Sequence, residues 1–304
     1  MSKKIIMITW GGIGDVLLCT PTIRAIKESN PDHKIIVYAS KEPHMEVFRN
    51  NPYVDTVRML KPMRMWRYPY HLYVYLFNRK KVKFYSLSFC YIPVYYLYRI
   101  NVRHIVPEIF PDLQFDRNIK NVQLFLTEAE NRKAIESLLP YKNVIILHIY
   151  SRTYQNHFWF HDRWEALVKS LPEYTFIQLG LVDEPHIKGA LDWRGKTNLR
   201  EAFALIKHAT SFVGIDSSHA HVTNAFNTPG VVLFGDSPPI CWGHENNINI
   251  YMGVKCSPCS DYLLNNPCPF NNSCMKLITV DMVRDALIKQ VNHRTKTSRV
   301  GNYA

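Results

Sequence analysis

The sequence lacks an uncharged apolar run long enough to cross a bilayer, which takes about 20 residues. Its longest uncharged aromatic run, residues 84–98, has 15 residues and is interrupted by Pro93. A secretory leader is also missing, because Lys3 and Lys4 precede only six largely apolar residues and no small-residue cleavage site follows. We therefore expect a protein of the cytoplasm that has no membrane span.

Two common nucleotide-binding motifs are absent. The glycine-rich loop Trp10–Asp15 does not have the G-x-G-x-x-G order of a dinucleotide fingerprint, and it has no Walker lysine. The sequence also contains no D-x-D pair of the kind with which metal-dependent transferases hold a donor diphosphate. The glycine-rich loop therefore argues against the usual nicotinamide and P-loop classes, and the missing D-x-D pair against a metal-dependent transferase.

Acidic residues are few relative to basic ones. The chain has 37 Lys and Arg against 25 Asp and Glu, which gives a formal charge of +12 and a pI near 9.3. Such a charge attracts polyanions, among them nucleic acid, anionic membrane surfaces, phosphorylated glycolipids and nucleotide phosphates. The charge alone does not distinguish these partners.

The sequence has an alternation of strand and helix patterns. Residues 4–9 have the pattern of a strand, 11–14 of a glycine turn and 15–29 of a helix, and a second strand at 34–38 follows at once. Strands separated by helices form parallel sheets, because parallel neighbours cannot be joined by tight hairpins. The first domain is therefore expected to be Rossmann-like.

The second half repeats this plan. The patterns predict helices at 128–139, 163–170 and 199–207 and strands at 143–148, 174–179 and 211–214. We predict an α/β fold with two Rossmann-like domains, 1–140 and 141–290, whose parallel sheets face a central cleft. Residues 291–304 are expected to form a flexible basic tail, because they have too few apolar side chains to bury.

Residues 62–105 combine aromatic side chains with many basic and few acidic ones. The simplest interpretation is a buried strand at 70–77 and a core-facing helix at 84–98 that Pro93 interrupts. The alternative is a patch that binds an acceptor or a membrane surface. The basic residues concerned are Arg64, Arg67, Arg79, Lys80, Lys81, Lys83, Arg99 and Arg103.

The first glycine turn ends in a carboxylate, Asp15. Glycines at the carboxyl end of a strand let a ligand approach the backbone closely, so Gly11, Gly12 and Gly14 are candidate ligand-binding positions. Asp15 opens a helix, where it could cap the first turn or face a cleft as a general base. Spacing alone leaves both roles open.

A second polar turn follows the strand at 211–214. Asp216, Ser217 and Ser218 stand where a helix begins, and the free N–H groups and dipole of a helix start suit a diphosphate. His221, one turn further, is either a proton donor to that diphosphate or an ordinary packed histidine. The turn is therefore a candidate phosphate site.

The chain has seven cysteines, an odd number that does not suit a secreted disulfide framework. Four of them have a spacing with which thiolates could complete a tetrahedral zinc or iron site: Cys256, Cys259, Cys268 and Cys274. Reduced thiols in a packed loop, or two labile disulfides, are the alternatives. The other cysteines are expected in the core: Cys19, Cys90 and Cys241.

Several segments together resemble glycosyltransferase family 9, the family of ADP-heptose:lipopolysaccharide heptosyltransferases. Their order and spacing match over nearly the whole chain, and many members of that family also have a cysteine-rich loop before the last helix. The segments are Gly11–Pro21, Trp159–Trp164, Gly195–Leu199, Asp216–His221 and Cys274–Val283.

The resemblance implies a GT-B architecture, in which the N-terminal half binds the acceptor and the C-terminal half the nucleotide sugar. Gly11, Gly12 and Gly14 are therefore the implied acceptor-binding positions. It also implies an inverting reaction without a catalytic metal, so that a metal at the four cysteines would be structural. Asp15 stands at the family's catalytic position and would take the proton from the acceptor hydroxyl. The implied donor-diphosphate residues are Ser151, Arg152, Asp216, Ser217, Ser218 and His221.

Two donor-binding positions depart from the family's pattern. His157 stands where the family usually has a lysine before its tryptophan motif, and a histidine need not be charged at neutral pH. Ser218 stands where glycine is common, which adds a hydroxyl but narrows the approach of a phosphate. Glu184 or its neighbour Asp183 is a further candidate, for the donor ribose.

We therefore expect a transferase that moves heptose from ADP-heptose, or a sugar from a similar nucleotide sugar, to a lipopolysaccharide core or other cell-surface glycan. A phosphorylated glycolipid acceptor and a peripheral position at the inner membrane would suit the basic charge. One alternative is a protein hydroxyl as the acceptor. The other is a non-catalytic module that binds nucleotides or polyanions. No nucleic-acid partner is expected.

Overall fold

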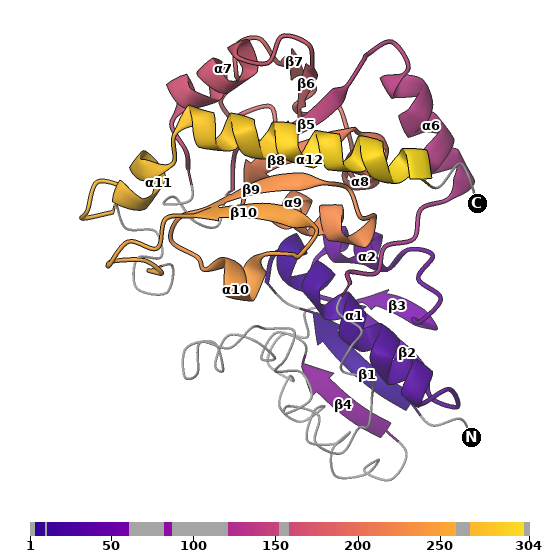
Figure 1. The fold of residues 1–304 in the computed structure, drawn as a ribbon. Helices are drawn as coiled ribbons and strands as arrows, with labels where there is room; N and C mark the ends of the chain where they lie inside the picture. The colour runs from indigo at the N-terminus through magenta and orange to yellow at the C-terminus, as the bar shows by residue number, and fades with distance from the viewer. Residues whose placement is uncertain are drawn as a thin grey trace. The chain divides into compact units, whose positions relative to one another are not determined.

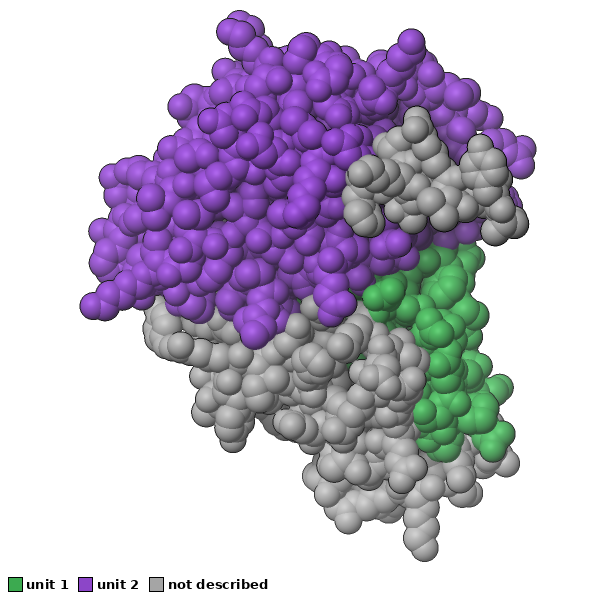
Figure 2. All heavy atoms as spheres, in the orientation of Figure 1, with its two compact units in different colours: residues 1–125 green, residues 126–304 purple. Residues whose placement is uncertain are grey.

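The computed structural model describes residues 4–9, 11–60, 82–86, 121–151, 158–259 and 268–300. Side chains are described throughout these ranges except in 82–86 and 293–300. The chain divides into two compact units, which comprise residues 1–125 and 126–304 (Figure 2). Each unit has its own parallel sheet, so the expected α/β fold with two Rossmann-like halves is confirmed.

Unit 1 is built on a parallel sheet in which the strand order is β3-β2-β1-β4 (Figure 1). The strands are β1 (Lys4–Thr9), β2 (Lys34–Ala39), β3 (Thr56–Met59) and β4 (Val82–Ser86). Helices α1 (Ile13–Ser29) and α2 (Glu42–Phe48) follow β1 and β2. The predicted order of strand, glycine turn, helix and strand over residues 4–38 is therefore confirmed.

Strand β1 is an inner strand, because its sequence is apolar at nearly every position. Ile5, Met7 and Ile8 are all buried, as expected where helices cover both faces of a parallel sheet. Helix α1 buries Leu17 and Ile23, and it also buries Cys19, as predicted. These residues fix the end of β1, and with it the position of the glycine turn.

The helix predicted for residues 84–98 is wrong at its start. Residues 84–86 belong to strand β4, which pairs in parallel with β1 from Lys4↔Val82 to Ile8↔Ser86. β-Branched and aromatic residues such as Val82 and Phe84 favour a strand, and the exposed edge of β1 provides the partner. The predicted strand at 70–77, residues 87–98 and most of the basic aromatic segment lie outside the described residues.

Unit 2 is built on a larger parallel sheet with the strand order β10-β9-β8-β5-β6-β7. Its strands are β5 (Val144–His148), β6 (Thr175–Gln178), β7 (Leu191–Asp192), β8 (Ser211–Ile215), β9 (Gly230–Phe234) and β10 (Asn247–Tyr251). Its helices are α6 (Glu128–Leu138), α7 (His161–Lys169), α8 (Leu199–His208), α9 (Ser218–Ala225), α10 (Pro239–Trp242), α11 (Ser273–Leu277) and α12 (Val280–Val300).

The strand order reverses between β5 and β8. From β5 the chain builds β6 and β7 on one side of the sheet, and then returns to place β8 on the other side. The carboxyl ends of β5 and β8 therefore lie next to each other, with His148 beside Gly214. In open parallel sheets such a switch point is where ligands bind.

Helix α6 belongs to unit 2, whereas the boundary expected near residue 140 would place it in the N-terminal domain. It packs against α8, and a bond from the Arg200 guanidinium to Glu130 joins the two helices. This bond lowers the pKa of Glu130 to about 2. The charged side chains on α6 are thus used for packing on α8, which a pattern of apolar residues does not reveal.

Helix α12 (yellow in Figure 1) packs against α7 and against strands β8, β9 and β10. It continues to Val300, whereas we expected a flexible tail from residue 291. Its last buried residue among those with described side chains is Val291. Lysine and arginine are good helix formers and are favourable near the carboxyl end of a helix, which explains the extension. Within the described parts of the chain, no helix is both long and apolar enough to span a membrane.

Candidate active site

The turn after β1 is shaped by Gly11 and closed by Asp15. Gly11 has φ +80°, a left-handed conformation that glycine adopts without strain. The backbone N–H of Gly12 donates a hydrogen bond of 2.6 Å to Oδ2 of Asp15, which therefore caps the helix that it opens. Gly14 lies in the first turn of α1. The carboxylate thus has a fixed orientation over the glycine turn.

Two side chains that follow β2, Lys41 before α2 and His44 within it, form contacts with the turn and with the end of β1. Lys41 Nζ donates a hydrogen bond of 3.0 Å to the carbonyl oxygen of Gly11. His44 is buried, and its Nδ1 lies 3.1 Å from Oγ1 of Thr9. Burial, and then the charge of Lys41, lower the pKa of His44 to about 4. His44 is therefore neutral at pH 7, and Lys41 is the cation of this loop that contacts the turn.

The turn after β8 begins with Asp216 and ends in helix α9. Ser217 occupies the N-cap position but makes no capping hydrogen bond through its side chain. Its Oγ lies instead 3.1 Å from Nδ1 of His148, at the end of β5. Ser218, the first residue of α9, places its Oγ 3.4 Å from Nδ1 of His219. The side chain of the N-cap residue therefore does not cap α9, and the N–H groups at the start of a helix are able to bind an anion.

His148 and His219 form a stacked pair beside this helix start. Their ring centroids are 3.8 Å apart and the rings are nearly parallel, with an angle of 19° between their planes. Burial lowers the pKa of both residues, to about 4 for His219 and well below the usual value for His148, where the second ring adds to the effect. Both imidazoles are therefore neutral at pH 7. Neither residue was expected to take part in the site, because their pairing depends on the order of the strands in the sheet.

Asp216 and His221 are both engaged by other side chains of unit 2. Ser237 donates a hydrogen bond of 2.6 Å from its hydroxyl to Oδ2 of Asp216. His221 is buried, and its Nδ1 lies 3.0 Å from Nε2 of His244. The ring of His221 therefore contacts another imidazole in the interior, one turn behind the residues that begin α9.

Glu184 lies in the turn that follows β6. It is buried, whereas its neighbour Asp183 is exposed. A Cβ atom at Gly180 would come within 2.1 Å of Oε2 of Glu184, so the carboxylate lies directly over this glycine. The guanidinium of Arg194 donates to the carbonyl oxygen of Glu184. Of the two carboxylates suggested for the ribose, Glu184 is therefore the buried one.

The remaining donor-binding positions are described only in part. Ser151 follows β5 and is half-buried. Arg152 and His157 lie outside the described residues. The tryptophan motif is described from Trp159 onward, and it serves the packing of α11, because Trp159 Nε1 donates a hydrogen bond of 2.9 Å to the carbonyl oxygen of Ile278.

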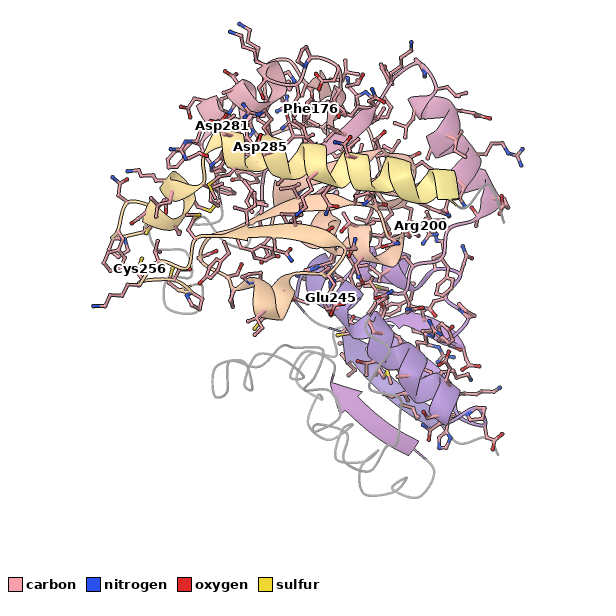
Figure 3. All side chains as sticks on the ribbon, in the orientation of Figure 1. Phe176, Arg200, Glu245, Cys256, Asp281 and Asp285 are labelled. Carbon is pink, nitrogen blue, oxygen red and sulfur yellow. The ribbon has the colours of Figure 1, made fainter. Side chains whose placement is uncertain are left out.

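The four late cysteines lie close enough to influence one another's charge. They are free thiols; Cys274 is buried and the others are half-buried, and Cys256 is labelled in Figure 3. Burial, Asp236 and the other three cysteines raise the pKa of Cys259 to about 12. Burial also raises the pKa of Cys274 to about 11. In the described parts of the chain, no group of three or more His, Cys, Asp or Glu side chains has the arrangement of a metal site.

The model of glycosyltransferase family 9 (heptosyltransferase) matches residues 111–268. A 53-residue segment is 45% identical to lipopolysaccharide heptosyltransferase 3 of Escherichia coli, and it covers 17% of this chain and 16% of that protein. The chain therefore matches only about a sixth of the length of this relative. Because the family model covers half of the sequence, the chain belongs to glycosyltransferase family 9.

Solved structures agree over almost the whole chain. A family 9 glycosyltransferase from Veillonella parvula aligns with a TM-score of 0.71 at 16% identity, over 96% of this chain and 99% of that one. The ADP-heptose lipopolysaccharide heptosyltransferase II of E. coli aligns with a TM-score of 0.68 at 17% identity, over 96% and 99%. The iron-containing dodecameric heptosyltransferase TibC gives a TM-score of 0.68 at 17% identity, over 97% and 77%. At these identities the likeness shows the fold, which is the expected GT-B fold.

Proposed function

We propose that the chain is an inverting glycosyltransferase that moves heptose from ADP-heptose to an acceptor hydroxyl of a lipopolysaccharide core or another cell-surface glycan. The observation that carries this proposal is the pair of turns at the carboxyl ends of parallel strands. One turn, in unit 1, carries an oriented carboxylate, Asp15. The other, in unit 2, carries a helix start that its own N-cap side chain leaves uncapped. Family membership supports the same reaction class.

In the proposed reaction Asp15 is the general base. The acceptor oxygen attacks the anomeric carbon from the face opposite the diphosphate, and its proton passes to the Asp15 carboxylate. The new bond between this oxygen and the anomeric carbon forms as the bond to the diphosphate oxygen breaks, and ADP leaves with the electron pair. The hydrogen bond from Gly12 fixes one carboxylate oxygen, and a positioned base typically contributes about 10²–10⁴ in rate.

The donor is proposed to lie along the carboxyl edge of the unit 2 sheet. The uncapped start of α9 would stabilise the charge that develops on the leaving diphosphate, with the hydroxyls of Ser217 and Ser218 beside it. Ser151 and Arg152, after the neighbouring strand β5, would add a hydroxyl and a guanidinium. Glu184 would bind the ribose. His221, already paired with His244, would support α9 from behind.

Asp15→Asn is the sharpest test of the base, because an amide oxygen can still accept the hydrogen bond from Gly12 but the side chain takes up no proton. With ADP-heptose and acceptor we expect kcat to fall at least 100-fold while the melting temperature stays nearly unchanged. Glu201→Gln is the matched control, because Glu201 caps α8 through the N–H of Asn198 in the same way. Comparable losses in both variants would refute the role of Asp15.

The acceptor is identified by the product. Incubation of the purified chain with ADP-heptose and a panel of lipopolysaccharide core fragments, other glycans and proteins, followed by mass spectrometry, distinguishes a glycan from a protein acceptor. Binding of ADP without turnover on any acceptor would favour the non-catalytic alternative. Sedimentation with vesicles that contain anionic lipid tests the proposed peripheral association with the cytoplasmic face of the inner membrane, for which the charge of +12 is the support.

We further propose that the four late cysteines hold a structural zinc or iron ion that takes no part in the transfer. Thiols fit such a metal chemically, and the other three cysteines contribute to the raised pKa of Cys259, which supports a shared location, although the described side chains do not have the arrangement of a metal site. Elemental analysis should give about one metal per chain in the isolated protein, and Cys259→Ser should lose it. A metal-free protein whose cysteines all react with a thiol reagent after denaturation would contradict the proposal.

A further inference from the structure

Ser237 is a buried residue that the proposed reaction does not yet use. It stands just after β9, and its side chain is 3% exposed. Its hydroxyl donates a hydrogen bond of 2.6 Å to Oδ2 of Asp216, in the turn after the neighbouring strand β8. Two adjacent strands thus meet, through one serine and one carboxylate, at the edge where the donor is proposed to lie.

The backbone and the side chain of Asp216 both form hydrogen bonds with β9 or with the turn that follows it. Its backbone N–H donates a bond of 3.2 Å to the carbonyl oxygen of Leu233, so the ladder between β8 and β9 extends one residue into the turn. Its side chain is held by Ser237. Because the carboxylate is only half-buried, it reaches the surface of the turn in a fixed orientation.

Ser237 is in turn braced by the loop that carries the first two late cysteines. The hydroxyl of Ser257 donates to the carbonyl oxygen of Gly235. The backbone N–H of Cys259 donates a bond of 2.8 Å to the carbonyl oxygen of Asp236. These carbonyls belong to the two residues that precede Ser237. The loop therefore holds the backbone from which the serine reaches Asp216.

Ser211, the first residue of β8, is a hydrogen-bonded serine with a purely structural role. Its Oγ donates a bond of 2.9 Å to the carbonyl oxygen of Pro229, and it is fully buried at the start of the strand. The acceptor of this hydrogen bond is a backbone carbonyl at the amino end of the strands, away from the turns of the proposed site. The bond of Ser237 ends on a carboxylate at the proposed donor edge. The two serines are therefore a matched pair that differs in the group each one holds.

We propose that Ser237 is a positioning residue for donor binding: it orients the Asp216 carboxylate, and the loop of Ser257 and Cys259 keeps it in place. This inference rests on the proposed function, because it takes the turn after β8 as the donor site. Loss of the hydrogen bond from Ser237 makes this orientation of the carboxylate less favourable, so the carboxylate must be ordered again when the nucleotide sugar binds. The cost falls on donor affinity and not on the chemical step.

The test uses the full chain and ADP as the probe. For Ser237→Ala we expect the Kd for ADP and the KM for the donor to rise about 10-fold, as for the loss of one charge-assisted hydrogen bond. The kcat at saturating donor and the acceptor KM should stay within about 2-fold. Ser211→Ala should leave the ADP Kd unchanged. Ser257→Ala should raise it by a smaller factor than Ser237→Ala.

A double-mutant cycle separates positioning from a general effect on folding. In an Asp216→Ala background, Ser237→Ala should no longer change the ADP Kd, because the group through which it acts is gone. An equal fold-change in both backgrounds, or an equal effect of Ser211→Ala, would overturn the inference. If the unsubstituted chain does not bind ADP at all, the proposed donor site itself fails. Binding by the unsubstituted chain with no change in Ser237→Ala overturns the positioning role alone.

Discussion

Replacing Gly11 with alanine should change the orientation of the Asp15 carboxylate while the carboxylate itself is kept. Gly11 has φ +80°, and a Cβ atom there would lie 2.2 Å from Oδ2 of Asp15. The side chain must therefore move away, although its charge and chemical group remain. If the carboxylate acts as a base in the orientation fixed by Gly12, activity should be lost without any change to Asp15 itself.

Two other glycines provide controls for the size of the effect. Gly253 has φ +56°, but the nearest atom to its added Cβ would be 3.7 Å away, so Gly253→Ala carries only the left-handed backbone penalty of about 1–2 kcal/mol. Gly12 has φ −92°, and its added Cβ would lie 3.6 Å from Oδ2 of Asp15, an ordinary contact. For Gly11→Ala the loss of the cap adds about 1 kcal/mol to the backbone penalty.

Urea unfolding and steady-state kinetics on these three variants test the reasoning. We expect the free energy of unfolding to fall by about 2–3 kcal/mol in Gly11→Ala and about 1–2 kcal/mol in Gly253→Ala, and to change little in Gly12→Ala. The kcat should fall about 100-fold or more in Gly11→Ala only. Full activity in a folded Gly11→Ala protein would show that the orientation of Asp15 is irrelevant and would refute its role as the base.

Three further predictions concern stability. The pKa of His44 is depressed to about 4, so the unfolded chain binds more protons than the folded one below pH 6.5, and His44 should contribute about 2 kcal/mol to the loss of stability between pH 7 and pH 5, in addition to the contributions of His148 and His219. Thermal melts at a series of pH values should show a smaller loss for His44→Asn than for the unsubstituted protein. Gly214→Ala would place a Cβ atom 2.3 Å from the carbonyl oxygen of His148, a backbone atom that cannot move away. Urea unfolding should therefore show that the free energy of unfolding falls by about 3 kcal/mol. An unchanged free energy would contradict the close approach of β5 and β8. Arg163→Lys should raise the rate of amide hydrogen exchange in α11 about 10-fold, because Nη1 of Arg163 donates to several carbonyl oxygens at the end of that helix, including that of Ile278. An unchanged exchange rate would show that these hydrogen bonds do not stabilise α11.

Local pattern was sufficient to predict the inner strands β1, β2, β5, β6 and β8, but not β3, β4, β7 and β10. The strand expected at 143–148 is β5, Val144–His148, and every residue of β5 is buried. The helix expected at 199–207 is α8, Leu199–His208. These segments could be predicted because a strand buried on both faces of a parallel sheet is apolar throughout, and because an amphipathic helix repeats its apolar positions.

The pairings within the site could not be predicted in this way. His148 meets His219 only because β5 and β8 are neighbours, although β6, β7 and two helices separate them along the chain. Ser237 reaches Asp216 for a similar reason, since β8 and β9 are adjacent. Strand order is a property of the whole sheet, so a scan of local motifs found Asp216 and Ser217 but missed the residues that hold them.

The six parallel strands of unit 2 have a consequence for engineering. All of its turns with polar side chains of the proposed donor site emerge from one end of the sheet, while the apolar strands beneath them form a separate, self-sufficient layer. Within the turn after β6, residues 181–183 are exposed, so their side chains can be varied without change to the buried strands. Glu184 and His219 cannot be varied in this way, because Glu184 lies buried over Gly180 and His219 stacks on the buried ring of His148.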